Sequence, residues 1–179
     1  DRIVWIDLET TGLEPHSHHI VEIGCIVTDG DLNPLDPGIA IVVKAPPIAL
    51  GNLSEFVWNM HRDSGLLDLI PFGMRPVDAE ETVLNYIKTY IPDPNTAPLA
   101  GSSVHFDRAF LADHMGSIDA YLHYRHIDVS TVKQLVARWN PDAATALPAS
   151  REIHRALPDL QDSIAELLYY RSVGLTAAA

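Results

Sequence analysis

Ile3-Val4-Trp5-Ile6-Asp7-Leu8-Glu9 is the segment that most clearly predicts the architecture of this chain. Its Ile, Val and Trp residues favour a buried strand, and Gly12 and Pro15 follow as turn formers. Side chains two positions apart leave a strand on the same face, so Asp7 and Glu9 converge on one point. Two like charges at one point need a cation. A metal site is one interpretation of this segment, and a solvated strand end is the other.

The rest of the chain predicts an α/β domain with a mixed sheet. Strands are expected at residues 3–9, 20–28 and 39–44, which together suggest an antiparallel meander, and a later one at residues 98–104. Apolar residues at helical spacing predict four helices, over residues 78–91, 106–115, 130–139 and 159–171.

Helix caps and buried faces are predicted from the same spacing. Asp78 and Glu81 form a capping-box pattern, and Ser130 is the expected cap of its helix. Residues 141–150 are rich in Pro and Ala and predict a surface loop. The inward-facing positions expected in the last two helices are Val132, Leu135, Val136, Trp139, Leu160, Ile164, Leu167 and Leu168.

Composition predicts one domain over residues 1–179, because the chain has 47% hydrophobic residues and can bury one sizeable core. A bilayer-spanning helix needs roughly 18 consecutive apolar residues, and no stretch approaches that length. The start, Asp1-Arg2, does not resemble a signal peptide. The single cysteine, Cys25, is expected to be a buried and inert thiol. We therefore expect a soluble cytoplasmic protein.

The formal charge of −12 bears on possible partners. Tight binding to long nucleic acids usually depends on many Lys and Arg contacts to phosphates. A nucleic-acid substrate of this chain should therefore be short. The other interpretation is that acidity only keeps the protein soluble.

Two further segments carry chemistry. Asp107 stands where a strand is expected to lead into a helix, and a lone Asp there is usually explained by the helix dipole. His154 lies five residues before Asp159, and Pro158 places Asp159 in the first turn of the last helix.

Together, Asp7, Glu9, Asp107, His154 and Asp159 match in order and spacing the signature of the DEDDh exonucleases. Nearly the whole chain resembles one group within them, the oligoribonucleases. The segments that carry this resemblance are Val4-Trp5-Ile6-Asp7-Leu8-Glu9 with Thr11-Gly12-Leu13, Val27-Thr28-Asp29 with Leu32-Asn33, Trp58-Asn59 and His61 to Ser64-Gly65-Leu66, Leu122-His123-Tyr124-Arg125, Asp128-Val129-Ser130-Thr131, and Ile164-Ala165-Glu166-Leu167 to Tyr169-Tyr170-Arg171.

The resemblance implies an RNase H-like fold and a 3′→5′ exoribonuclease that releases nucleoside 5′-monophosphates from short oligoribonucleotides, dinucleotides especially. Hard oxygen ligands suit two Mg²⁺ or Mn²⁺ ions better than zinc. By the resemblance, Asp7 bridges both ions, Glu9 and Asp159 hold the ion on the side of the attacking water, and Asp107 holds the other. His154 is the implied general base.

The resemblance also implies a substrate site and a homodimer. Leu13 would wedge the bases, and Tyr124 and Arg125 of a partner subunit would close over the 5′ end and block longer chains. The substrate-binding residues so implied are Thr10, Thr11, Gly12, Leu13, Trp58, His61, Ser103, Tyr124, Arg125, Ser130 and Thr131. For Leu13 and Tyr124 taken alone, ordinary packing is the alternative.

Some positions depart from the oligoribonuclease pattern: Thr10 replaces the usual Met, and Ser102 the usual Asn. Thr10 makes Asp-x-Glu-Thr-Thr-Gly, which is common in proofreading-type exonucleases, so an exonuclease acting on DNA ends or longer RNA is the alternative function. A catalytically silent homologue is the third hypothesis. His16, His18 and His19 fit a polar loop better than a zinc site.

Overall fold

The computed structural model describes residues 1–146, 151 and 153–173. Five strands form one mixed sheet in the order β3-β2-β1-β4-β5. Their bounds are β1 Arg2–Thr10, β2 Ile20–Asp29, β3 Ile39–Val42, β4 Pro98–Gly101 and β5 His123–Asp128. β1, β2 and β3 pair antiparallel, while β4 runs parallel to both β1 and β5. The predicted α/β fold and meander are therefore confirmed, and β1 is the central strand.

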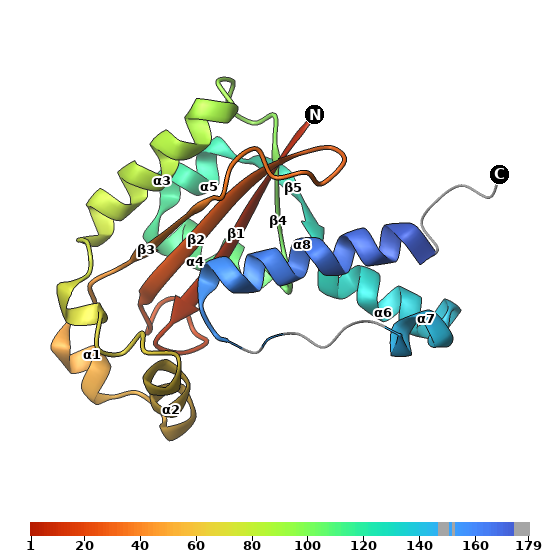
Figure 1. Ribbon diagram of the computed structural model, residues 1–179. Coiled ribbons are helices and arrows are strands. Elements are labelled where there is room, and N and C mark those ends of the chain that lie inside the picture. Colours follow the sequence, from red (N-terminus) through yellow and green to blue (C-terminus); the bar gives the residue numbers. More distant parts are fainter. Residues whose placement is uncertain (147–150, 152, 174–179) are drawn as a thin grey trace.

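Helices cover both faces of the sheet (Figure 1). Their bounds are α1 Pro47–Gly51, α2 Glu55–Asp63, α3 Pro76–Tyr90, α4 Val104–His114, α5 Gly116–Tyr121, α6 Val129–Trp139, α7 Pro141–Thr145 and α8 Ala156–Val173, with a 3₁₀ turn at Ile70–Phe72. α3, α4 and α5 pack on one face of the sheet, and α6 and α8 on the other.

The alternation of β1 explains where its acidic residues point. Val4 and Ile6 are buried in the core under α3 and α4, whereas Trp5 is buried in the core under α6 and α8. Residues of one parity share a face, so Asp7 and Glu9 continue the face of Trp5. The two carboxylates therefore lie on the side of the sheet that α8 crosses.

Two predicted caps are wrong. Asp78 lies inside the first turn of α3, which has Arg75 as its N-cap and Pro76 as its first residue, and Asp78 pairs with the Arg75 guanidinium at 2.6 Å. Pro fixes φ near its helical value and starts the helix earlier than the capping pattern suggested. In α6, Asp128 is the cap, because its carboxylate accepts from the backbone N–H groups of Ser130 and Thr131.

Several boundaries and faces also differ from the prediction. β4 ends at Gly101, so Val104 begins α4 instead of ending a strand. Leu168 is 40% exposed and Trp139 is 73% exposed, so these two do not face the core. Leu135 is also exposed.

The expected loop at residues 141–150 contains α7, and residues 147–150 lie outside the described residues. β5, α1, α2 and α5 were not predicted. α1 and α5 are only five and six residues long, which is too short for a helical period to show. Cys25 is buried as expected, and burial raises the pKa of its thiol. Within the described part of the chain, no helix combines the length and hydropathy that crossing a bilayer requires.

Candidate active site

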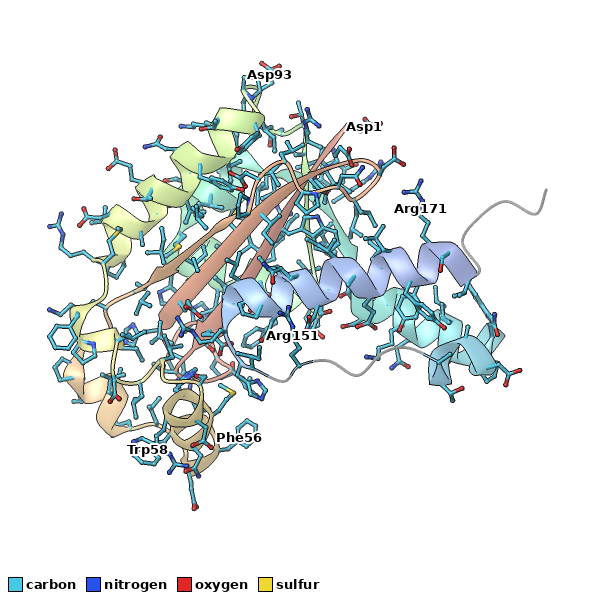
Figure 2. All side chains as sticks on the ribbon, in the orientation of Figure 1. Asp1, Phe56, Trp58, Asp93, Arg151 and Arg171 are labelled. Carbon is cyan, nitrogen blue, oxygen red and sulfur yellow. The ribbon has the colours of Figure 1, made fainter. Side chains whose placement is uncertain are left out.

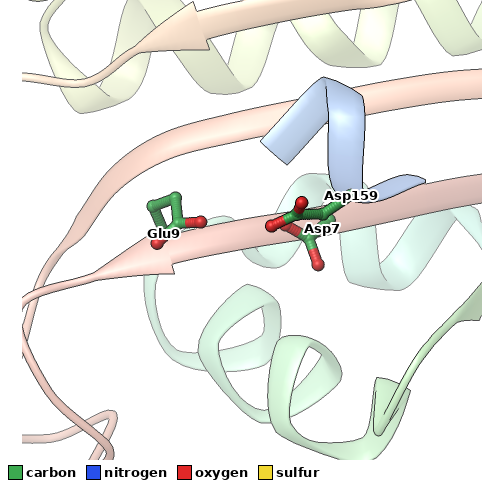
Figure 3. Close-up of side chains that lie close together, drawn as sticks. All are labelled: Asp7, Glu9 and Asp159. Atoms are coloured by element: carbon green, nitrogen blue, oxygen red, sulfur yellow. The ribbon is translucent and has the colours of Figure 1, made fainter. Parts of the chain in front are cut away.

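Asp7, Glu9 and Asp159 come together on one face of the sheet, over the central strand β1 (Figure 3). The first two lie two residues apart on β1, and Asp159 belongs to the first turn of α8, where Pro158 is tolerated. Each residue offers an oxygen, and these oxygens lie within 4.8 Å of one another. The three carboxylates can therefore bind a common cation.

Burial makes this carboxylate cluster unfavourable without a cation. Burial, with the nearby Asp159 charge, raises the pKa of Asp7 to about 7. Burial and the Asp7 charge raise the pKa of Glu9 to about 8, and burial also raises the pKa of Asp159. A divalent cation would reverse these shifts, because it favours the ionised carboxylates.

Asp107 lies in the first turn of α4 and is 4% exposed. Its Oδ1 accepts a hydrogen bond from the backbone N–H of Leu8 at 3.0 Å, which ties α4 to β1 between the two acidic residues of that strand. Burial, followed by the Asp7 charge, raises the pKa of Asp107. Asp107 thus stands beside the cluster, although its oxygens are not within the 4.8 Å group that the described residues form.

His154 lies two residues before α8, with a left-handed φ of 53°. Its side chain is exposed and lines a cavity of about 570 Å³ together with Phe56 and Met60 of α2. Burial raises the pKa of Asp159 and His154 acts in the opposite direction, so the imidazole lies within electrostatic range of that carboxyl. The imidazole therefore reaches solvent beside the cluster.

The loop after β1 uses its threonine hydroxyls internally. Thr10 Oγ1 donates to the Gly12 carbonyl at 2.7 Å, and Thr11 Oγ1 accepts from the His19 backbone N–H at 2.9 Å. His18 Nδ1 also lies 3.2 Å from Thr11 Oγ1. These bonds hold the loop so that Leu13 protrudes at 74% exposure.

A second cavity, of about 690 Å³, begins at Glu9 and runs along this loop. Leu13 forms one wall, and Phe56 and Met60 of α2 form another. Phe56 and Met60 are four residues apart, so they share one face of the helix. Sequence reasoning missed both, although this i, i+4 spacing was a usable signal.

Trp58, which was predicted to bind substrate, lies elsewhere on α2. Figure 2 labels Phe56 and Trp58 at the end of the molecule that α2 occupies. The Arg62 guanidinium lies 4.9 Å from the centre of the Trp58 ring, and Trp58 does not line the 690 Å³ cavity. The sequence did not distinguish the two aromatic residues, because α2 itself was not predicted.

His61 is fully buried and contacts two residues of β1 that belong to the site. Its Nε2 donates to the Thr10 carbonyl at 2.9 Å, and its Nδ1 lies 3.8 Å from Glu9 Oε2. Burial lowers the pKa of His61, which keeps the ring neutral. In this geometry His61 holds the end of β1 and does not face the cavity.

Three of the remaining predicted residues line a third cavity, of about 320 Å³, and the other two lie on β5. Ser103, Ser130 and Thr131 line the cavity, and Ser130 Oγ accepts from the Ser103 backbone N–H at 2.9 Å. Tyr124 and Arg125 lie on the edge strand β5, where Tyr124 is 71% exposed and the Arg125 guanidinium is 5.3 Å from its ring.

Comparison with known proteins shows the family. The RNase T exonuclease family matches residues 4–167. The oligoribonuclease of Leifsonia xyli subsp. xyli is 46% identical over 99% of this chain and 86% of its own length. That of Streptomyces griseus is 48% identical over 96% of this chain and 85% of its own length. The chain belongs to the oligoribonuclease family. It is a 3′→5′ exonuclease.

Solved structures show the same fold at low identity. Exonuclease I of Methylocaldum szegediense superposes with a TM-score of 0.70 at 16% identity, over 98% of this chain and 41% of that one. Exonuclease I of E. coli, in complex with a 5cy-dT13 oligonucleotide, gives 0.67 at 15% identity, over 97% of this chain and 41% of that one. This oligoribonuclease-family chain thus spans about two fifths of those enzymes.

The cluster suits the metal chemistry of the oligoribonuclease family. Exonucleases of this family depend on divalent metal, and the donors here are carboxylate oxygens alone. Hard cations such as Mg²⁺ and Mn²⁺ prefer oxygen ligands. The raised carboxyl pKa values agree with a site whose ionised form needs a cation.

The pKa values predict how the metal-free protein responds to pH. The Asp7 carboxyl has a pKa of 3.8 in the unfolded reference and about 7 in the folded protein. Such a group contributes stability below its unfolded pKa, and the contribution is lost as pH rises through the folded pKa. In EDTA, the free energy of unfolding should therefore fall between about pH 4 and pH 8, and Asp7→Asn should reduce that fall. Urea denaturation of both proteins at several pH values measures it, and equal slopes would contradict the assignment.

Proposed function

We propose that the protein removes nucleoside 5′-monophosphates from the 3′ end of short oligoribonucleotides, with dinucleotides as preferred substrates and two Mg²⁺ or Mn²⁺ ions per site. The cluster of Asp7, Glu9 and Asp159, of which Glu9 also lines the 690 Å³ cavity beside Leu13, is the observation that carries this proposal. The exonuclease family and the oligoribonuclease relatives support it. We place the activity in the cytoplasm, in keeping with the buried thiol of Cys25.

The acidic residues and His154 divide the chemistry between them. When bound, the metal ions lower the pKa of an attacking water and stabilise the leaving 3′ oxygen. Asp7, Glu9 and Asp159 would hold the water-side ion, and Asp7 would share the second ion with Asp107. His154, exposed beside Asp159, would accept the proton of the water.

The cavity beside the cluster would hold the 3′-terminal nucleotides. Leu13 on one wall and Phe56 with Met60 on the other offer apolar surfaces to the bases. Thr10, Thr11 and Gly12 would meet the terminal ribose through their backbone, because the two hydroxyls are already used within the loop. His61 would act indirectly, by holding Thr10 and Glu9.

A 5′ cap would make the enzyme selective for short chains. Ser103, Ser130 and Thr131 line a cavity in which their hydroxyls would meet a 5′ phosphate. Tyr124 and Arg125 project from an edge strand, in keeping with a homodimer in which the partner's copies of these residues close the cap. The net charge of −12 also disfavours long polyanions. The domain itself is proposed to cover residues 1–179.

Substrate length tests the proposed function. A 5′-labelled RNA series of two to seven nucleotides, with a matching DNA series, is incubated with Mn²⁺ or Mg²⁺. We expect fast cleavage of the RNA dinucleotide and slow attack on longer chains, because the cap excludes them.

Asp7→Ala is the control and should be inactive, since it removes a ligand of both metal ions. Comparable rates at all lengths, or on DNA, would instead assign a general exonuclease. Absent or metal-independent cleavage would assign a catalytically silent homologue.

Two aromatic residues of α2 provide a matched test of the cavity. Base stacking on an aromatic ring contributes about 1–3 kcal/mol, so Phe56→Ala should lower kcat/KM for the dinucleotide by roughly 5- to 150-fold. Trp58→Ala should change it by less than about twofold, because Trp58 does not line the cavity. Steady-state kinetics of the two variants measure this. A larger loss for Trp58→Ala would show that its ring, and not that of Phe56, contacts substrate.

A further inference from the structure

Two residues of β2 lie directly opposite the acidic residues of β1. In the antiparallel register, Glu22 pairs with Glu9 and Gly24 pairs with Asp7. Directly opposed residues share a face of the sheet. Glu22 is therefore a further carboxylate on the face that carries the cluster, and its side chain is only 1% exposed.

Glu22 is occupied by the segment that leads into α8. Arg155 Nε donates to both carboxylate oxygens at 3.0 Å, and its Nη2 donates to Oε1 at 2.5 Å. The backbone N–H of Ala156, the first residue of α8, donates to Oε2 at 2.9 Å. One buried side chain of the sheet thus binds both the residue before α8 and the helix start.

Arg155 is connected to the catalytic residues on both sides. Its carbonyl accepts the backbone N–H of Asp159 at 3.1 Å, and it directly follows His154, whose φ of 53° is uncommon for a residue other than Gly. A left-handed residue persists only where its surroundings hold it. The bonds to Glu22 supply such a restraint immediately after His154.

Gly24 provides the space for this arrangement. A Cβ at position 24 would lie 2.9 Å from the Ala156 carbonyl carbon and 2.9 Å from its Cβ. The first turn of α8 therefore rests directly on β2, at the position opposite Asp7.

We infer that Glu22 and Arg155 act as a positioning pair, which fixes the start of α8 against the sheet. The pair sets where His154 and Asp159 stand relative to the carboxylates of β1. It also occupies both oxygens of Glu22 and so keeps this carboxylate out of the metal-binding set. The inference rests on the function proposed above for the same site, but it concerns residues that have no direct role in that chemistry.

The test compares Arg155→Gln, Arg155→Lys and Glu22→Gln with the wild-type protein. Loss of a residue that orients metal ligands typically lowers metal affinity or activity by about 10- to 100-fold. For Arg155→Gln and Glu22→Gln we expect kcat for the dinucleotide to fall by that factor, with KM little changed. We also expect their Mn²⁺ affinity, measured by calorimetry, to be at least tenfold weaker. Arg155→Lys should recover only part of it, because Lys lacks the bidentate geometry.

Arg171→Gln is the matched control. Arg171 lies in the last turn of α8, far from Asp159, and pairs with Asp31 at 2.6 Å. This variant should keep wild-type kcat and Mn²⁺ affinity. If Glu22→Gln does not fold, the Arg155 variants still decide, since that side chain is partly exposed.

The inference would be overturned if Arg155→Gln had the same kcat and Mn²⁺ affinity as the control. A lower melting temperature alone would then show that the pair is merely structural. If the wild-type protein cleaves no RNA dinucleotide, the proposed substrate is wrong, and the Mn²⁺ affinities still test the pair.

Discussion

Repulsion among buried and half-buried carboxylates is the constraint on which this structure depends. Asp7, Glu9 and Asp159 share one point, with Asp107 behind them, and burial raises the pKa of all four. Ionised groups so close together are tolerated only with opposite charge between them. A divalent cation supplies that charge, so the features that destabilise the metal-free protein are those that bind the metal. Under the function proposed above, stability and activity are coupled through this one cluster.

The fold brings these four carboxylates together from three parts of the chain. β1 fixes two of the carboxylates by its alternation, α4 is tied to the same strand through the Leu8 N–H, and α8 delivers Asp159 by packing on β2. Close packing at Gly24 and the buried carboxylate of Glu22 determine how α8 approaches. The two residues opposite the β1 acids thus contact the start of the helix that carries Asp159.

Much of this could be predicted from the sequence, and the failures have physical reasons. The period-two pattern of β1 and the position of Pro158 fix local geometry, so the sheet, the meander and the place of Asp159 in the first turn of α8 were predictable. The helix itself begins at Ala156, before the predicted start at Asp159. The helix caps were not predictable. Asp128 and Ser130 are both residue types that cap helices, and Pro76 begins α3 before Asp78. The i, i+4 spacing of Phe56 and Met60 indicates that they share a face of α2, but which face borders the cavity depends on how the helix is oriented in the tertiary structure.

The most direct test of the account is a calorimetric titration of the protein with Mn²⁺, in the presence of a nucleoside 5′-monophosphate. The account predicts two ions bound per chain for the wild-type protein, and loss of at least one of them in Asp7→Asn, whose fold should remain intact. No saturable Mn²⁺ binding by the wild-type protein, or equal binding by the variant, would contradict the claim that these carboxylates form the catalytic metal site.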